Sequence, residues 1–154
     1  MSLKEKLKKL EAKEKEQAVN WEETRRIWVS AVKDLYQQIE LWFKPLIDEN
    51  LMHVDPTTKL LDDGPMGEYE IPQLEVAMGA KTIIFEPVAR NVIGAQGRID
   101  LYVRGYKEEK WSILRFEESE KKSRWELCKS SNKFDRKPLN KTNLETLFEQ
   151  WITG

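Results

Sequence analysis

A wide apolar stripe along residues 21–46 constrains the fold of this chain more than any other feature of its sequence. The stripe repeats at alternating spacings of four and three residues, which places its members on one face of an α-helix. These members are Trp28, Val32, Leu35, Ile39, Trp42 and Leu46, with Ile27, Ala31, Tyr36 and Phe43 beside them. Asn20 and Glu23 form an N-terminal capping signature, and Pro45 favours an end to the helix. We therefore expect an amphipathic helix over 20–46 that packs on a sheet.

Residues 1–19 predict a more highly charged helical extension. Leu3, Leu7 and Leu10 share one helical face, and Glu11 and Lys15 are four residues apart, as a stabilising ion pair requires. A stripe of only three leucines makes this segment marginally stable alone. We expect it to dock on a partner chain, as in a coiled coil, or to fray.

Alternating apolar and polar residues dominate 51–129 and predict strands. The clearest alternation runs through Leu74, Val76 and Met78 and through Ile99, Leu101 and Val103. Short loops join the successive strands, which favours an antiparallel meander of five or six strands. The stretches Leu51–Val54 and Lys59–Leu61 are expected to be separate short strands around the turn Asp55-Pro56.

The last apolar face, over 142–153, predicts a short C-terminal helix with Thr142 and Glu145 as a capping box. The sequence thus predicts a single α+β domain over 1–154. It comprises a long N-terminal helix, an antiparallel meander and a short C-terminal helix. The helices should cover one face of the sheet and leave the other to solvent.

Composition excludes several classes of protein. The formal net charge is −1, so no overall field attracts nucleic acid or anionic lipid. The chain has no apolar run long enough for a membrane span and no signal peptide at its start. A single cysteine, Cys128, excludes an intramolecular disulfide and a four-cysteine zinc site. We expect a cytoplasmic protein without membrane contact.

Few residues suggest chemistry. The one histidine, His53, has no serine or cysteine motif near it, and a structural or surface role is favoured. Asp62 and Asp63 lie in a glycine-containing loop, but their spacing does not fit a calcium loop, and solvated loop acids are the favoured interpretation. We predict no catalytic residue, no cofactor and no metal.

Charge is unevenly distributed along the chain. Residues 45–78 contain eight acidic side chains against Lys59 alone, whereas residues 121–141 contain eight basic side chains against two acidic ones. The candidate basic patch comprises Lys121, Lys122, Arg124, Lys129, Lys133, Arg136 and Lys137. Such a stretch, with Trp125 and Phe134 inside it, could contact nucleic acid. Pairing of the basic stretch with the acidic stretch of this chain or of a second copy is favoured over contact with nucleic acid.

A candidate binding face lies on the strand over 98–104. Arg98, Asp100, Tyr102 and Arg104 point away from the apolar residues of that strand and combine hydrogen-bonding groups with an aromatic ring. A solvated face with cross-strand ion pairs is an equally good interpretation.

The segment Gly97-Arg98-Ile99-Asp100-Leu101, followed by Trp111–Phe116, resembles the core of restriction-endonuclease-like nucleases. That family carries a metal-binding Asp on one strand and a Glu-x-Lys on the next. Here Arg115 and Glu117 occupy those two positions and have the opposite charge, so the resemblance fails at the metal site.

The whole chain is similar to a group of small uncharacterised bacterial proteins. The similarity is carried by the Trp-rich helix with Leu35-Tyr36-Gln37-Gln38, by Phe85-Glu86-Pro87 and by Ile93-Gly94-Ala95-Gln96-Gly97-Arg98-Ile99-Asp100-Leu101-Tyr102. It implies a bacterial origin and no particular activity.

Together these features predict a non-enzymatic protein-binding or assembly module. Its partner would be another protein or a second copy, bound through the N-terminal helix. A nucleic-acid-associated protein that uses the basic stretch is the alternative. A divergent metal-dependent nuclease with Asp62, Asp63 or Asp100 is a third and weaker one.

Overall fold

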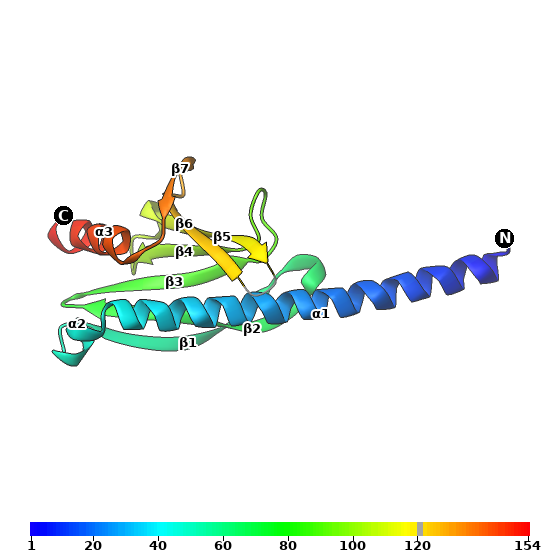
Figure 1. Cartoon of the computed structure of the whole chain (residues 1–154), viewed down its shortest axis with the longest axis horizontal. Coiled ribbons are helices and arrows are strands. Elements are labelled where there is room, and N and C mark those ends of the chain that lie inside the picture. The colour runs from blue at the N-terminus through cyan, green and yellow to red at the C-terminus, as the bar shows by residue number, and fades with distance from the viewer. Residues whose placement is uncertain (120–121) are drawn as a thin grey trace.

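The computed structural model describes residues 1–119 and 122–154. Within them, helices pack on one face of an antiparallel sheet (Figure 1). The elements are α1 (Leu3–Trp42), α2 (Lys44–Asp48), β1 (His53–Asp62), η1 (Gly64–Met66), β2 (Glu68–Met78), β3 (Lys81–Ala89), β4 (Arg98–Val103), η2 (Lys107–Glu109), β5 (Trp111–Ser119), β6 (Lys122–Lys129), β7 (Asn132–Pro138) and α3 (Lys141–Thr153). The predicted α+β class is confirmed, but the sheet has seven strands among the described residues rather than five or six.

Helix α1 is continuous over 40 residues. Its first turn is capped by Ser2, whose Oγ accepts a hydrogen bond from the Glu5 amide at 3.2 Å. No glycine or proline occurs between Ser2 and Pro45, so nothing in the backbone interrupts the helix. The helix start predicted at Asn20 is therefore wrong. The chain leaves α1 at Phe43, and Pro45 lies in the first turn of the short helix α2.

The sheet is a simple meander in which each strand pairs antiparallel with the next. Gly79 turns β2 into β3 with a φ of 59°, as a tight hairpin requires. The two short strands expected around Asp55-Pro56 form one continuous strand, β1. Because β1 is an edge strand, Pro56 can lie within it without breaking a hydrogen-bonded ladder on both sides.

The C-terminal part differs from the prediction in two places. Every residue of β7 is exposed, so this strand lacks the apolar alternation that marks the other strands, and the predicted sheet ended too early at residue 129. Helix α3 is capped by Asn140, whose Oδ1 accepts a hydrogen bond from the Asn143 amide at 2.8 Å. Thr142 lies inside the helix, so the predicted capping box is wrong.

One apolar core lies between the sheet and the helices. Trp28, Val32 and Ile39 of α1 and Phe148 of α3 pack on the same face of the sheet. Inner residues of the strands complete this core: Leu74, Val76, Ile83, Phe85, Ile99, Leu101, Ile113 and Leu127. The expectation that the helices cover one face is confirmed. This packing holds the C-terminal half of α1 beside β5 and β6, where a cleft lies.

Candidate functional site

The predicted binding face lies on the side of β4 that points away from the helices. Arg98, Asp100 and Tyr102 alternate with the core residues of β4, and Arg104 follows directly after the strand. Asp100 is only 3% exposed. Its Oδ1 accepts hydrogen bonds from Arg98 Nε at 2.8 Å and Ser112 Oγ at 3.4 Å, and Lys110 Nζ lies 3.5 Å from its Oδ2. The structure thus brings the four residues together, but the carboxylate of Asp100 is engaged by Arg98, Ser112 and Lys110.

Glu86 of β3 joins this face to the edge of the sheet. It accepts hydrogen bonds from Lys59 Nζ at 2.8 Å and from the Tyr102 hydroxyl at 3.0 Å, and Lys107 Nζ lies 3.0 Å away. Burial raises the pKa of Glu86, but these three donors outweigh it and lower the pKa to about 2.

Tyr102 and Arg104 are also engaged. Burial, followed by the hydrogen bond to Glu86, raises the pKa of the Tyr102 hydroxyl to about 12. Arg104 pairs with Glu75 of β2. The charged groups of the face therefore pair with one another across strands β1 to β5. This arrangement corresponds to the second interpretation of the sequence, a face of cross-strand ion pairs.

The acidic residues named in the nuclease hypothesis belong to different elements of the fold. Asp100 pairs across β4 and β5 with Ser112, while Asp63 lies at the end of the β1–β2 hairpin. Asp63 Oδ2 is bonded there by the Tyr69 hydroxyl at 2.5 Å and the Arg90 amide at 3.0 Å. Asp62 is exposed on β1. Among the described residues, no group of three or more histidine, cysteine or acidic side chains could hold a metal ion.

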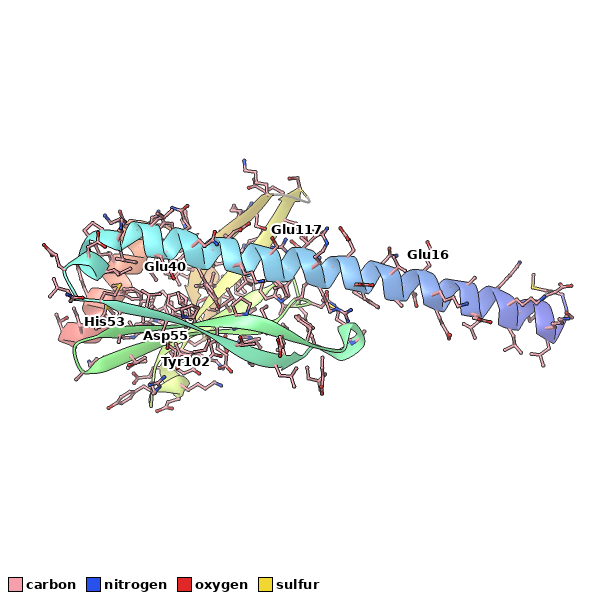
Figure 2. The ribbon with its side chains drawn as sticks, turned by 90° about the horizontal axis from the view of Figure 1, so that it is seen from below. Glu16, Glu40, His53, Asp55, Tyr102 and Glu117 are labelled. Carbon is pink, nitrogen blue, oxygen red and sulfur yellow. The ribbon has the colours of Figure 1, made fainter. Side chains whose placement is uncertain are left out.

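The single histidine and the single cysteine have unrelated surroundings. His53 begins β1 and is exposed, with Asp55 two residues further along the same strand (Figure 2). Cys128 is buried on β6, and burial raises the pKa of its thiol. Neither environment activates a nucleophile.

The candidate basic patch is divided between the two faces of the sheet. Arg124 and Arg136 lie over the ring of Phe116, with Glu126 between them in ion-pair contact with both. On the opposite face, the Nζ atoms of Lys129 and Lys137 lie 6.0 and 5.5 Å from the ring centre of Trp111.

Three further residues of the basic patch occupy other positions. Lys122 lines the cleft beside α1, and Lys133 is exposed on β7. Lys121 lies outside the described residues. The basic residues therefore do not gather on one surface in the described part of the chain.

A cleft of about 500 Å³ lies between α1 and the β5–β6 hairpin. The α1 residues that line it range from Glu23 to Trp42, and the strands contribute Arg115, Ser123 and Trp125. Apolar and polar groups alternate along it. The lining consists of Glu23, Arg26, Ile27, Ser30, Ala31, Asp34, Leu35, Gln38, Trp42, Arg115, Lys122, Ser123, Trp125 and Leu139.

Arg115 is the most unusual residue of this cleft. It lies on the inner face of β5, two residues after the core residue Ile113, and is only 1% exposed. Its Nε donates to Ser123 Oγ at 2.8 Å, and its Nη1 donates to the Gln96 carbonyl at 2.9 Å and to Glu117 Oε1 at 3.0 Å. Burial lowers the pKa of the guanidinium, and Glu117 offsets this only in part.

The sequence singled out Arg115 only as a residue of the wrong charge for a metal site. A signal was nevertheless present, because the alternation of the strand over 111–116 points position 115 inward with Ile113. A charged residue at an inward position is rare in a strand and marks either a buried ion pair or a binding site. The sequence did not predict that α1 lies beside Arg115.

The first part of α1 projects from the body of the protein. Residues 3–20, here called the projecting segment, are all exposed and extend beyond the sheet, as the position of Glu16 shows (Figure 2). Leu3, Leu7 and Leu10 lie on one of its faces and are 72%, 54% and 50% exposed. Among the described residues, no helix is both long and apolar enough to cross a membrane.

No protein-family model, no curated protein and no solved structure matches this chain. The similarity to small uncharacterised bacterial proteins, with the bacterial origin that it implies, therefore stays a prediction. The function has to be argued from the geometry alone.

Proposed function

We propose that this chain is a non-enzymatic assembly module that dimerises through its projecting segment. The observation that carries the proposal is the row Leu3, Leu7 and Leu10, which is at least half exposed at each position although the helix is complete. Exposed leucines at spacings of four and three residues form the seam of a two-stranded coiled coil.

The helical conformation of the projecting segment has a physical reason. An isolated helix of this length is marginal in water because the first turn is costly to nucleate. Here the core-packed residues of α1, from Trp28 to Ile39, supply the nucleus, and the helix propagates from them without interruption. The projecting segment is therefore already helical before a partner binds.

Charge supports a second copy as that partner. In a parallel pair, Lys6 of one chain lies opposite Glu11 of the other, on both sides of the leucine seam. The seam continues with Glu14, which disfavours further pairing toward the body and leaves room for the two bodies to diverge. The cost of association offsets much of the free energy gained by burying the six leucines, so we expect a weak dimer whose population depends on concentration.

The test is the mass of the protein in solution. Sedimentation velocity and light scattering across micromolar concentrations should show a concentration-dependent dimer for the full chain. A chain that begins at Asn20 should be a monomer throughout. It loses no core residue, because residues 1–20 are all exposed. Equal masses for the two chains at every concentration would refute the proposal.

A pair of matched substitutions separates the seam from general surface hydrophobicity. Leu7→Glu places a charge in the seam and should abolish the dimer. Leu41→Glu makes the same change on the same helix at a residue that is 64% exposed and lies outside the seam, so it should leave the dimer intact.

The remaining parts of the proposal are a cytoplasmic location and the absence of catalysis. The buried, unpaired state of Cys128 is compatible with a reducing compartment. The pairing of charged groups on the outer face leaves Asp100 and Glu86 in structural roles.

A further inference from the structure

At one end of the cleft, Arg115 belongs to a cluster in which, among the described residues, arginines outnumber carboxylates. Arg115 and Arg90 share the carboxylate of Glu117, at 3.0 and 3.1 Å, so two guanidinium groups face one carboxylate. Among the described residues, no other carboxylate lies within ion-pair distance of Arg115. A buried charge that is not fully balanced is costly, and a bound anion would offset that cost.

Arg115 also has hydrogen-bonding capacity to spare. Its Nε and Nη1 are occupied, but Nη2 has no acceptor in the described part of the chain. Ser123, whose hydroxyl accepts from Arg115 Nε, lines the same cleft and can donate its own proton. Lys122 lies at the rim. These donors surround one end of the cleft.

Among the described residues, the acidic side chains that line the cleft form no ion pair with Arg115. Glu23 of α1 pairs with Arg26, with Arg26 Nη2 and Glu23 Oε1 2.5 Å apart. A hydrogen bond from Arg26 lowers the pKa of Glu23. Asp34 lies about three helical turns beyond Glu23 on α1, on an exposed part of the helix.

The two ends of the cleft differ in character. The Arg115 end lies near Trp28 of α1, because Arg115 bonds the Gln96 carbonyl and the next residue, Gly97, lies against the Trp28 ring. Figure 2 likewise shows Glu117, the partner of Arg115, beside the part of α1 between Glu16 and Glu40.

From the Arg115 end, the apolar lining leads to the other end of the cleft. It passes Trp125 and Leu35 and reaches Trp42 and Leu139. Leu139 directly precedes α3, which packs on Phe43 at the C-terminal end of α1. These apolar side chains form one wall of the cleft, beside the polar Ser30, Asp34 and Gln38, so a ligand with a charged end could lay an apolar tail along that wall.

We propose that this cleft binds a small amphipathic carboxylate with an unbranched apolar tail, its carboxylate bound by Arg115 and Ser123 and its tail along Trp125, Leu35 and Trp42. The volume of about 500 Å³ lies in the range of small-molecule sites. The arginine provides the geometry for a carboxylate, and the tryptophans provide flat apolar walls. This site is separate from the leucine seam of the projecting segment, so the proposed binding does not depend on the dimer.

The test compares decanoate with decanol, which has the same tail without the charge, in isothermal titration calorimetry of the full chain. We expect one decanoate per chain and at least tenfold weaker binding of decanol, because a hydrogen bond to a charged group in a shielded site accounts for about that ratio. Quenching of tryptophan fluorescence should follow the same titration. No binding of decanoate, or equal binding of the two compounds, would overturn the proposal.

Variants locate the site. Arg115→Met removes the guanidinium charge but keeps an unbranched apolar stem, leaves Glu117 paired with Arg90, and should reduce decanoate affinity to that of decanol. Arg104→Met removes an arginine that pairs with Glu75 on the outer face and should bind decanoate like the natural chain. Unchanged affinity in a folded Arg115→Met chain would disprove the assignment.

A second variant keeps the test decisive if Arg115→Met does not fold. Ala31 is a partly exposed α1 residue that lines the cleft, and Ala31→Trp should fill it and abolish decanoate binding without touching the charged cluster. Full decanoate binding by this variant would overturn the proposal. Binding of a peptide through its C-terminal carboxylate, in the absence of decanoate binding, would likewise replace the proposed ligand class.

Discussion

Gly97 lies against the ring of Trp28 at the start of β4. A Cβ atom at this position would lie 2.3 Å from Trp28 Cζ3, and the backbone has a φ of 153°. Trp28 is fully buried, so its ring has no space into which it could move. The absence of a side chain at residue 97 therefore sets how closely α1 approaches the sheet.

We predict that Gly97→Ala destabilises the protein by about 2–4 kcal/mol, because overpacking adds to backbone strain. Gly94→Ala is the matched control, since Gly94 has a φ of 82° but no other group lies within 4 Å of the place that the new methyl group would occupy. It should cost only about 1–2 kcal/mol. Urea denaturation at equilibrium measures both, and equal losses would show that the contact with Trp28 is unimportant.

Glu86 should make the stability of the folded protein depend on pH. Its pKa falls from an ordinary value of 4.5 to about 2 in the folded protein. Its contribution to stability is therefore present above about pH 4.5 and is lost as the pH falls toward 2. Glu86→Gln should cost about 1–3 kcal/mol at pH 7, and the difference from the natural chain should shrink between pH 4.5 and 2. Melting temperatures across that range test this, and a constant difference would contradict it.

At the scale of elements, α1 combines two parts with different stabilising contacts. From Trp28 onward it is held by the core, whereas residues 3–20 are all exposed. Stability that depends on packing should therefore reside in the second part alone.

We predict that removal of residues 1–19 changes the free energy of unfolding of the dilute monomer by less than about 0.5 kcal/mol, as for surface changes in general. The far-UV circular dichroism should nevertheless lose the helical signal of the removed residues. A large drop in stability would mean that the projecting segment folds back on the body.

The elements also show how far the sequence leads. Periods of 3.6 and 2 residues predicted the helices and most strands, because a buried face imposes them. Strand β7 escaped prediction because all its residues are exposed and its place depends on pairing with β6. The helix start predicted at Asn20 is wrong because a residue of a capping type can also lie inside a long helix. The two cases differ only in the conformation of the backbone that precedes the residue.

At the scale of the whole molecule, the larger of two apolar clusters among the described residues contains or touches most of the tryptophans. Trp28 lies inside it, and Trp42, Trp111, Trp125 and Trp151 pack against it from both helices and from β5 and β6. Fluorescence from these side chains thus reports on the same packing that holds sheet and helices together.

We predict a single cooperative transition, in which tryptophan fluorescence and the circular dichroism of the sheet share one urea midpoint. The chain that begins at Asn20 is the better sample for this, since it lacks the helical signal of the projecting segment. Two separated midpoints would show that α3 or the β6–β7 hairpin unfolds independently.

The candidate site could be predicted from the sequence only in part. The face of Arg98, Asp100, Tyr102 and Arg104 followed from alternation along one strand, since a strand orders its own side chains. Its pairing with Lys59, Glu75 and Glu86 did not, because partners from other strands depend on register. The cleft beside Arg115 depends on the distance between a helix and a hairpin far along the chain from it, which no local pattern encodes.

The continuity of α1 has a mechanical consequence. Because the same helix is anchored in the core and leads outward to Ser2, its free tip cannot swivel against the body as a tethered peptide would (Figure 1). A helix of 40 residues measures about 60 Å. A partner bound to the N-terminal end of α1 is thus held at a fixed distance and a fixed angle from the sheet, and the chain acts as a rigid spacer.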